Sequence, residues 1–272
     1  MKDIQNKNII ITGASSGIGK SLAYECAAKG ANLTLAARNF SVLKGIAIEL
    51  ESKYSIQVLI VETDVTKELD CELLIKTSVE KFGRIDVLIC NAGISMRALF
   101  DETNLEVIKS VMNVNFWGTV YCSHFAISHL LKSNGTLVGI SSIAGYKGLP
   151  GRSGYSASKF AMQGFLESIR IENLKKGLDV LVACPGFTSS NIRNVALAKD
   201  GTTQGESPLN ESKITSSKEV AEAIIHAIVD QKRTLVLSSQ GKLTVWLNKF
   251  FPAWLDKMVY KHFASEPDSP LK

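Results

Sequence analysis

The stretch Asn8-Ile9-Ile10-Ile11-Thr12-Gly13-Ala14-Ser15-Ser16-Gly17-Ile18-Gly19 decides the fold. Its first half is an almost continuous apolar run, which is typical of a β-strand covered on both faces. Its second half has the glycine spacing G-x-x-x-G-x-G, and a segment with helical periodicity begins there. Such glycines allow a tight turn, close approach of the backbone to a pyrophosphate and close packing of helix on strand. The stretch therefore predicts a dinucleotide-binding turn, with phosphate contacts at Gly13, Ser15, Ser16, Gly17, Ile18 and Gly19.

Strand and helix patterns alternate after this turn. Apolar runs rich in Ile, Val and Leu predict strands at Asn8–Thr12, Asn32–Ala37, Gln57–Glu62, Ile85–Cys90, Thr136–Ser141, Asp179–Cys184 and Thr234–Ser238. Helical spacing predicts helices at Gly17–Gly30, Phe40–Tyr54, Lys67–Phe82, Leu105–Leu131, Tyr155–Lys176 and Lys218–Asp230. This alternation predicts an α/β fold: a doubly wound (Rossmann) parallel sheet of about seven strands with helices on both faces, in a single domain. Capping boxes, Thr103 with Glu106 and Ser216 with Glu219, mark two helix starts.

The chain divides into a main domain and a tail. We expect residues 1–240 to form the dinucleotide-binding catalytic domain and residues 241–272 to form a C-terminal amphipathic extension. One connection, residues 188–217, is too long and too weakly patterned for a routine loop. Connections of this length are usually lids or binding loops, so we interpret it as a specificity loop, with a disordered excursion as the alternative.

Composition excludes several classes of protein. The 272 residues carry 31 basic and 26 acidic side chains, a net charge of +5, without the concentrated basic stripe that nucleic acid requires. The five cysteines are odd in number and widely spaced, which favours buried thiols in a reducing compartment over disulfides. Residues 1–8 are polar and lack the apolar core of a signal peptide. We therefore expect a cytoplasmic protein that binds no nucleic acid.

The end of the second predicted strand bears on cofactor choice. An acidic residue about 20 positions after the glycines selects NAD by binding the ribose 2′-hydroxyl. This chain has Ala37 there, followed by Arg38. A guanidinium can hold a 2′-phosphate, so the sequence favours NADP(H). A solvated arginine at a strand end is the alternative interpretation of Arg38.

Tyr155-Ser156-Ala157-Ser158-Lys159 places a phenol and an ammonium on one face of a helix. A tyrosine is a poor acid or base at neutral pH unless a nearby cation favours its phenolate, and Lys159 supplies that cation. Taken alone, such a pair is more often a packed tyrosine beside a lysine. Ser142 follows the fifth strand, at the edge where open α/β sheets bind ligands, and Asn91-Ala92-Gly93 follows the fourth. Asn115 lies in an apolar helix, so its amide should be buried and hydrogen-bonded, which a satisfied core amide would also explain.

These motifs, in this order, resemble the classical short-chain dehydrogenase/reductase family over nearly the whole chain to about Ser238. The resemblance implies that Ser142, Tyr155 and Lys159 form the reactive triad and that Asn115 completes a tetrad through a water. Tyr155 would exchange the proton, Ser142 would hold the substrate oxygen, and Lys159 would lower the pKa of Tyr155 and bind the nicotinamide ribose.

The same resemblance implies further cofactor contacts. Asp64 and Val65 would meet the adenine ring, Asn91 the adenosine side, and Pro185, Gly186 and Thr188 the nicotinamide carboxamide. An arginine at position 38 is similar to the NADP-preferring branch, although many of those proteins carry a second basic residue where this chain has Ser16. The segment 185–205 also resembles the dehydrogenase/reductase member 7 group, some of which act on lipids or steroids.

The sequence thus predicts an NADP(H)-dependent oxidoreductase that interconverts a carbonyl and an alcohol on an apolar substrate, with Tyr155 as acid/base. A non-catalytic dinucleotide-binding sensor or scaffold of the same fold is the alternative. The four histidines lack the spacing of a zinc site, so no metal is expected. The family resemblance implies a homodimer or homotetramer that associates through Leu105–Leu131 and Tyr155–Lys176.

Aromatic and lysine residues alternate in the tail between residues 242 and 263. Its four lysines fall within about a third of a helix's circumference, a pattern with which a helix can lie on an anionic membrane surface. We expect Pro252 to kink this helix and its charges to prevent it from spanning a membrane. A C-terminal helix of this kind more often packs over the substrate pocket of its own chain or against a neighbouring subunit.

Overall fold

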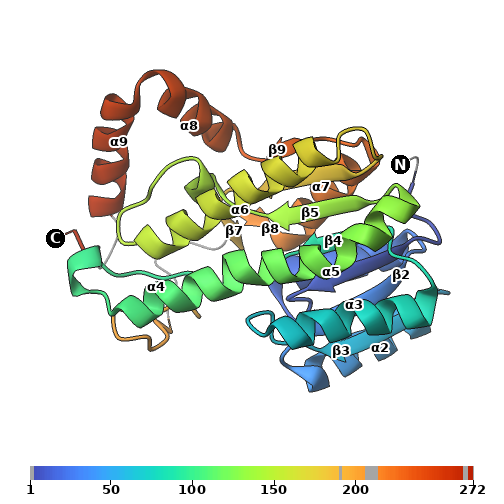
Figure 1. The fold of residues 1–272 in the computed structure, drawn as a ribbon. Helices are drawn as coiled ribbons and strands as arrows, with labels where there is room; N and C mark the ends of the chain where they lie inside the picture. Colours follow the sequence, from blue (N-terminus) through green and yellow to red (C-terminus); the bar gives the residue numbers. More distant parts are fainter. Residues whose placement is uncertain (1–2, 190–191, 206–213, 266–268, 272) are drawn as a thin grey trace.

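The sheet predicted from the sequence is present in the computed structural model, which describes residues 3–189, 192–205, 214–265 and 269–271. Seven parallel strands lie in the order β3-β2-β1-β4-β5-β6-β9 (Figure 1). The strands are β1 Asn8–Thr12, β2 Asn32–Ala37, β3 Val58–Glu62, β4 Val87–Cys90, β5 Thr136–Ile140, β6 Asp179–Cys184 and β9 Thr234–Val236. The doubly wound α/β fold is therefore confirmed.

Nine α-helices surround or extend this sheet in the part of the chain that the structure describes. They are α1 Gly17–Ala28, α2 Phe40–Lys53, α3 Glu68–Phe82, α4 Leu105–Met112, α5 Gly118–Ser133, α6 Ser153–Glu172, α7 Ser217–Val229, α8 Ser239–Phe250 and α9 Pro252–Ala264. Two short 3-10 turns, η1 Phe100–Glu102 and η3 Ile143–Gly145, and the two-residue strands β7 Thr188–Ser189 and β8 Thr215–Ser216 complete the fold.

Two hydrophobic cores lie on opposite faces of the sheet. Side chains alternate between the faces of a strand, so Ile9 and Ile11 of β1 belong to one core and Ile10 to the other. Helices α1, α2 and α7 cover the first core, and α3, α5 and α6 cover the second, which faces the viewer in Figure 1. Burial on both faces explains why the strands are almost uniformly apolar.

The predicted helix Leu105–Leu131 is one rod with a widened turn. A π-helical turn, η2 Asn113–Trp117, separates α4 from α5. Inside it, the buried Asn115 side chain hydrogen-bonds to the backbone of Ile94, and Thr119 donates to the Asn115 carbonyl at 2.9 Å. Single-turn π-bulges often lie at functional sites, and periodicity does not reveal them.

One predicted capping box is confirmed and the other is wrong. Ser216 and Glu219 cap α7 reciprocally. Helix α4 is instead capped by Asn104, whose side chain accepts from the N–H of Glu106 at 2.9 Å. Thr103 donates its hydroxyl to the Leu99 carbonyl and closes the preceding turn. Asn104 directly precedes the first residue of α4, so its side chain reaches the free N–H groups of the helix, and it replaces Thr103 as the cap.

The tail forms two helices rather than the expected single kinked helix. Helix α8 ends at Phe250, and Pro252 is the first residue of α9. Proline lacks an N–H and suits the first turn of a new helix, so it breaks the segment completely. Both helices lie at one end of the molecule, beyond α6 (Figure 1). Within the described residues, no helix has the length and apolar character needed to cross a membrane.

The described parts of the connection 188–217 are ordered against the main domain; residues 190–191 and 206–213 lie outside the described residues. Leu197 forms bridges with Met96 and with Thr203. Thr188 and Ser189 of β7 pair in parallel with β8. The disordered alternative is therefore wrong for these described parts.

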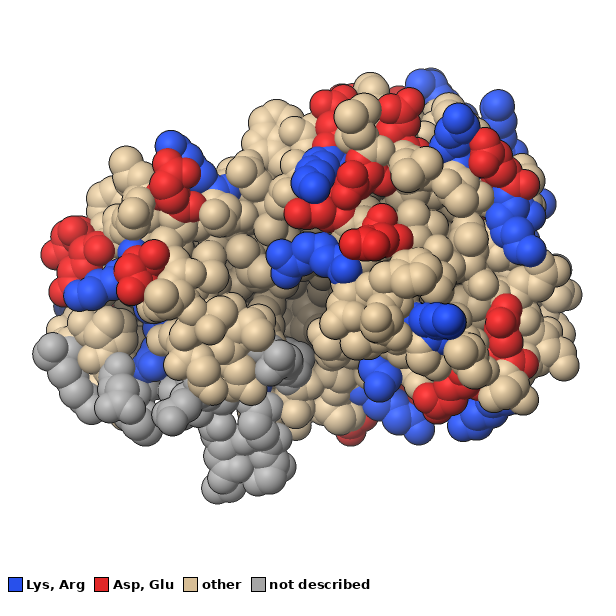
Figure 2. Space-filling view, turned by 90° about the horizontal axis from the view of Figure 1, so that it is seen from below, with Lys and Arg blue, Asp and Glu red and all other residues tan. Residues whose placement is uncertain are grey.

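Charged groups are mixed on the surface. On the face seen in Figure 2, Lys and Arg side chains alternate with Asp and Glu, and a hollow opens near its centre. All five cysteines are free and buried, as predicted.

Candidate active site

Three positions in and after the turn between β1 and α1 require glycine. Gly13 and Gly17 have φ angles of +66° and +53°, in the left-handed region. A Cβ on Gly19 would lie 2.3 Å from the Gly13 carbonyl oxygen, and one on Gly13 would lie 2.9 Å from the Ala92 Cα. Ser16, at the start of α1, makes no side-chain cap. The first N–H groups of α1 therefore remain for an anion, which fits a dinucleotide pyrophosphate.

Asn91 and Thr12 hold this turn against the next strand. The Asn91 amide donates to the carbonyl oxygens of Thr12 and Gly13, at 2.9 and 3.2 Å. The Thr12 hydroxyl accepts the backbone N–H groups of Asn91 and Ala92, at 3.0 and 3.1 Å. Asn91 thus fixes the shape of the phosphate turn.

Tyr155, Lys159 and Ser142 meet at the carboxyl edge of the sheet. Tyr155 and Lys159 lie one turn apart on α6, with the Lys159 Nζ atom 5.8 Å from the centre of the Tyr155 ring. Lys159 is buried and donates to the Ile140 carbonyl at the end of β5, at 2.8 Å. Ser142, two residues later, caps η3, and its hydroxyl lies close enough to lower the pKa of the Tyr155 phenol. The three predicted triad residues are therefore together.

Burial dominates the electrostatics of this group. It raises the pKa of Tyr155 above 10, and hydrogen bonding with Ser142 and the charge of Arg152 offset the rise only in part. Burial also lowers the pKa of Lys159 from 10.5 to about 8. Arg152 supplies the charge that lowers the pKa of Tyr155 in the structure, and burial outweighs it. That Lys159 lowers this pKa stays a prediction. At neutral pH Tyr155 is a protonated phenol and Lys159 still carries most of its charge.

Asn115 is fully buried, and its amide is hydrogen-bonded, as the sequence predicts. Its Oδ1 atom accepts from the Ile94 N–H at 2.8 Å, and its Nδ2 atom donates to the Ile94 carbonyl at 3.0 Å. The same Nδ2 atom donates to the Ser158 hydroxyl, at 2.9 Å. These bonds tie the segment after β4 to α6. The part of Asn115 in a tetrad through a water stays a prediction.

The predicted adenosine contacts lie along the ends of β2 and β3. Arg38 is exposed directly after β2. Asp64 is half-buried, and its Oδ1 atom accepts from the backbone and hydroxyl of Thr66. Val65 is buried against Gly118, where a Cβ would lie 2.8 Å from Val65. These residues lie at the edge where the phosphate turn opens.

The predicted nicotinamide contacts follow β6. Pro185 is buried, Gly186 is half-buried against Ser238, and the Thr188 hydroxyl donates to the Gly186 carbonyl at 3.1 Å. The Thr188 carbonyl accepts from the Arg193 guanidinium at 2.9 Å. The residues after β1, β4, β5 and β6 therefore share the carboxyl edge of the sheet, where α/β folds of this kind bind dinucleotides.

A family model described as short chain dehydrogenase matches residues 7–200. The chain belongs to the short-chain dehydrogenase/reductase family of oxidoreductases. This dehydrogenase chain is 36% identical over 253 residues to the 11-beta-hydroxysteroid dehydrogenase-like 4A of Arabidopsis thaliana, covering 93% of this chain and 83% of that protein. It is 34% identical over 276 residues to 11-beta-hydroxysteroid dehydrogenase A of Arachis hypogaea, and the match covers 99% of this chain and 79% of that protein.

Solved structures agree with this family fold. An alcohol dehydrogenase from the archaeon Thermococcus sibiricus, complexed with 5-hydroxy-NADP, superposes with a TM-score of 0.76 at 26% identity, covering 85% of this chain and 95% of that one. A short-chain dehydrogenase/reductase from Burkholderia phymatum in complex with NAD has a TM-score of 0.84, with 94% and 97% coverage. Its identity of 23% shows the fold alone.

Two positioning residues of this dehydrogenase were not found from the sequence. The buried Gln163 amide donates to the Ser141 hydroxyl at 2.9 Å and to the Ser142 carbonyl at 3.5 Å. Ser158 accepts from Asn115 and donates to the Tyr155 carbonyl at 2.7 Å. Both lie one turn from Tyr155 or Lys159 on the same helix, a spacing that could have identified them.

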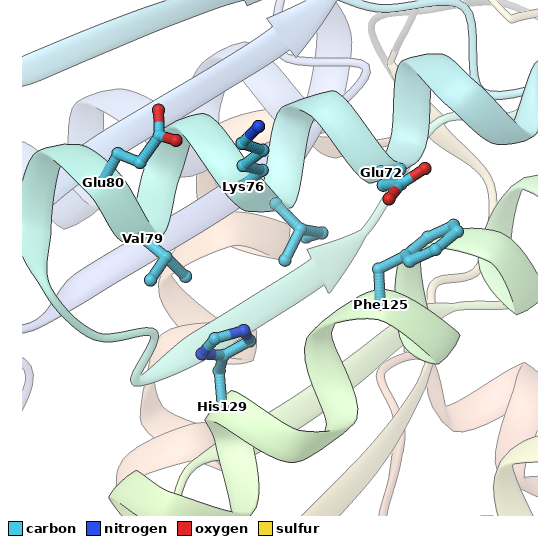
Figure 3. A pocket seen from close by; sticks show the side chains of 7 residues that line it. Glu72, Lys76, Val79, Glu80, Phe125 and His129 are labelled. Carbon is cyan, nitrogen blue, oxygen red and sulfur yellow. The ribbon is translucent and has the colours of Figure 1, made fainter.

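Other cavities and clusters lie apart from this site. A surface pocket of about 300 Å³ between α3 and α5 is lined by none of the predicted site residues. Figure 3 shows Phe125 and His129 of α5 facing α3. The charged ends of Lys76 and Glu80, which also line the pocket, point away from α5. Among the described residues, no three His, Cys, Asp or Glu side chains gather as a metal site.

Proposed function

We propose that this dehydrogenase interconverts a carbonyl and an alcohol, with Tyr155 as the acid/base. The observation that carries the proposal is the contact of Tyr155 with Ser142, one helical turn from Lys159, at the sheet edge that also bears the glycine turn. In the reducing direction, Tyr155 donates its proton to the carbonyl oxygen, while Ser142 holds that oxygen by a hydrogen bond. The raised pKa keeps the phenol protonated for this step. The charges of Lys159 and Arg152 stabilise the phenolate that remains, which regains a proton from solvent.

A nicotinamide dinucleotide supplies or accepts the hydride when bound, and the carbonyl carbon takes or loses it as the oxygen changes protonation. The glycine turn and α1 would hold the pyrophosphate, Asp64 and Val65 the adenine, and Lys159 the nicotinamide ribose. The residues Pro185, Gly186 and Thr188 would border the carboxamide. The tight contacts at Gly13 and Gly19 support this arrangement, since a side chain at either position would clash with the Gly13 carbonyl or with residues 91–92 and so distort the turn.

The cofactor is proposed to be NADP(H). Arg38 lies exposed directly after β2, with no carboxylate at position 37 to repel a 2′-phosphate. The complex of the similar Thermococcus sibiricus enzyme with 5-hydroxy-NADP supports this choice. We expect Arg38→Ala to weaken NADPH binding by roughly tenfold or more, as the loss of a charge-assisted phosphate contact does, and to leave NADH binding unchanged. Calorimetric titration tests this, and tighter wild-type binding of NADH than of NADPH would contradict it.

The substrate is proposed to be apolar. A small apolar cluster of Met96, Ala98, Val107 and Val111 packs beside Tyr155, and Leu197 of the connection 188–217 joins it. The relatives named 11-beta-hydroxysteroid dehydrogenase support a lipid-like or steroid-like alcohol. Both observations favour a hydrophobic ketone or secondary alcohol.

The decisive experiment compares Tyr155→Phe with wild type, using a panel of apolar ketones and aldehydes and the absorbance of reduced nicotinamide. We expect turnover to fall about 10²–10⁴-fold, the usual contribution of a positioned acid, while NADPH affinity is kept. Tyr24→Phe on α1, which removes a phenol that donates to Glu49, is the matched control and should keep full turnover. Unchanged turnover in Tyr155→Phe would exclude the mechanism. Cofactor binding without turnover of any substrate by wild type would favour a non-catalytic sensor.

The assembly is proposed to be a homo-oligomer that associates through the outer faces of α4, α5 and α6. Trp117, Phe160 and Ile171 are exposed on or beside these helices. Trp117 stacks on Tyr121, which makes part of this face aromatic. Light scattering should give a dimer or tetramer for wild type and a smaller species for Phe160→Glu.

A further inference from the structure

Exposed apolar side chains concentrate on the two tail helices. The structure describes twenty large hydrophobic side chains as exposed, and seven of them lie within the eighteen residues from 243 to 260. These seven are 47–55% exposed: Leu243, Trp246, Phe250, Phe251, Trp254, Met258 and Tyr260. Scattered single hydrophobic residues need no explanation, but a contiguous aromatic patch marks an interaction surface. We call this set the tail patch.

The tail patch is separate from the residues that fold the tail. On α8, Leu243, Trp246 and Phe250 follow one another at helical spacing, with the Trp246 and Phe250 rings 5.3 Å apart. On α9, the buried side is formed by Leu255 and Phe263. The exposed aromatic residues are therefore not required to close a core.

The other side of the tail is fixed to the main domain. Lys147 forms an ion pair with Asp256, and the Asn248 amide donates to the Tyr146 carbonyl at 2.8 Å. The Arg152 guanidinium lies 5.2 Å from the centre of the Phe263 ring. All these contacts fall on residues 146–152, between Ser142 and Tyr155. The tail patch thus faces outward from helices that are fixed next to the candidate active site.

Lysines surround the tail patch. Lys242 and Lys249 flank the stripe on α8, and the Lys249 Nζ atom lies 5.8 Å from the centre of the Phe250 ring. On α9, Lys257 and Lys261 are exposed at helical spacing from Trp254. Asp256 is the only acidic residue between positions 239 and 264, so this segment carries four lysines and a net charge of +3, counting histidine as neutral.

This chemistry favours a lipid surface over a protein partner. Tryptophan and phenylalanine side chains insert at the boundary of headgroups and acyl chains, and lysines attract anionic headgroups while their stems cover apolar surface. Protein interfaces, by contrast, are depleted in lysine. Both helices are too short to span a bilayer but suited to lie on one.

We propose that the tail patch docks this protein on an anionic lipid bilayer. Trp246, Phe250 and Trp254 insert at the interface, and Lys242, Lys249, Lys257 and Lys261 bind the headgroups. Docking brings the segment between Ser142 and Tyr155 close to the bilayer. Access of a bilayer-dissolved substrate to the site rests on the proposed function, whereas binding itself does not.

The test is flotation of the full chain with vesicles, without cofactor or substrate. We expect wild type to float with vesicles of phosphatidylcholine mixed with phosphatidylglycerol, and much less with phosphatidylcholine alone or at high salt. Trp246→Ala combined with Phe250→Ala and Trp254→Ala should reduce partitioning by roughly tenfold or more. The control, Leu69→Ala with Leu73→Ala, removes two exposed leucines of α3 and should float like wild type.

Charge reversal gives a second test that does not depend on the folding of the aromatic variant. Lys242→Glu with Lys257→Glu should abolish flotation with the anionic vesicles, while Lys44→Glu with Lys175→Glu, at exposed positions elsewhere, should not. In a Trp117→Phe background, brominated lipid should quench the fluorescence of Trp246 and Trp254. Equal flotation of the tail and control variants, absence of quenching, or a tail variant that changes only the oligomeric state would overturn the proposal. The last result would assign the patch to a second copy of the chain.

Discussion

The β1–α1 turn and the α8–α9 tail both border the carboxyl edge of the sheet, and they are held there by different contacts. The backbone of the turn is close-packed, with the Gly13 carbonyl oxygen 2.3 Å from where a Gly19 Cβ would lie, and the side chains of Asn91 and Thr12 hydrogen-bond to it or to the next strand. The tail is held by an ion pair to Asp256, a side chain that is 65% exposed, and by a cation–ring contact to Phe263. A turn with such close backbone packing accepts almost no substitution at its glycines, whereas a tail held by surface side chains can change without disturbing the sheet. The cofactor side of the candidate site is therefore the rigid one.

The largest effect is expected from a methyl group in the turn. Gly19→Ala forces the Cβ against the Gly13 carbonyl and the Asn91 amide, and overpacking of this kind costs about 1–3 kcal/mol or more. We expect NADPH affinity to fall roughly 10–100-fold in calorimetric titration. Gly45→Ala, on α2 with nothing within 4 Å of the new Cβ, is the control. It should keep cofactor affinity and stabilise the protein by up to about 1 kcal/mol. Equal loss of affinity in both variants would refute the comparison.

The second effect is a difference in the pH dependence of stability between the buried Lys159 and the exposed Lys257. The folded-state pKa of Lys159, about 8, lies below its ordinary value of 10.5. Between these values the unfolded chain binds more protons than the folded one, so the contribution of Lys159 to stability rises with pH. In denaturant unfolding, the free energy of unfolding of wild type should therefore rise relative to that of Lys159→Met as the pH increases across this range. Lys257→Met, at an exposed tail lysine, should track wild type at every pH. A flat difference for Lys159→Met would mean that its ammonium is not desolvated.

The smallest effect is a difference in stability between variants that lack the cap of α7 and variants that lack the cap of α8. Ser216 caps α7, which packs in the main core, and Ser238 caps α8, which packs on the surface. Loss of a serine cap costs about 1 kcal/mol of helix stability. Ser216→Ala should lower the global free energy of unfolding by that amount. Ser238→Ala should leave it unchanged and speed only hydrogen exchange within α8. A global loss in both variants would show that the tail unfolds together with the sheet.

Local sequence signals were sufficient for the sheet. The apolar runs identified all seven strands of the sheet, with β4 and β9 two residues shorter than predicted, and the glycine spacing located the turn after β1. They also placed Ser142, Tyr155 and Lys159 together, because residues after parallel strands share one edge and residues four apart share one helix face. Contacts between distant segments left no such signal. The π-turn around Asn115, which bonds to Ile94 and Ser158, is the example. The cap by Asn104 and the break at Pro252 are local, and there the sequence offered two interpretations, of which the prediction took the other one.

Sequence alone determined the doubly wound sheet and the identity of the residues that gather at its edge, since both follow from periodicity over neighbouring residues. Only the tertiary structure decided how those residues behave. The pKa of Tyr155 rises because the folded chain removes water from it, and no pattern of neighbours records that burial. The tail likewise displays its aromatic rings outward because Leu255 and Phe263 take the inner side of α9, a choice fixed by contact with residues more than a hundred positions earlier in the chain.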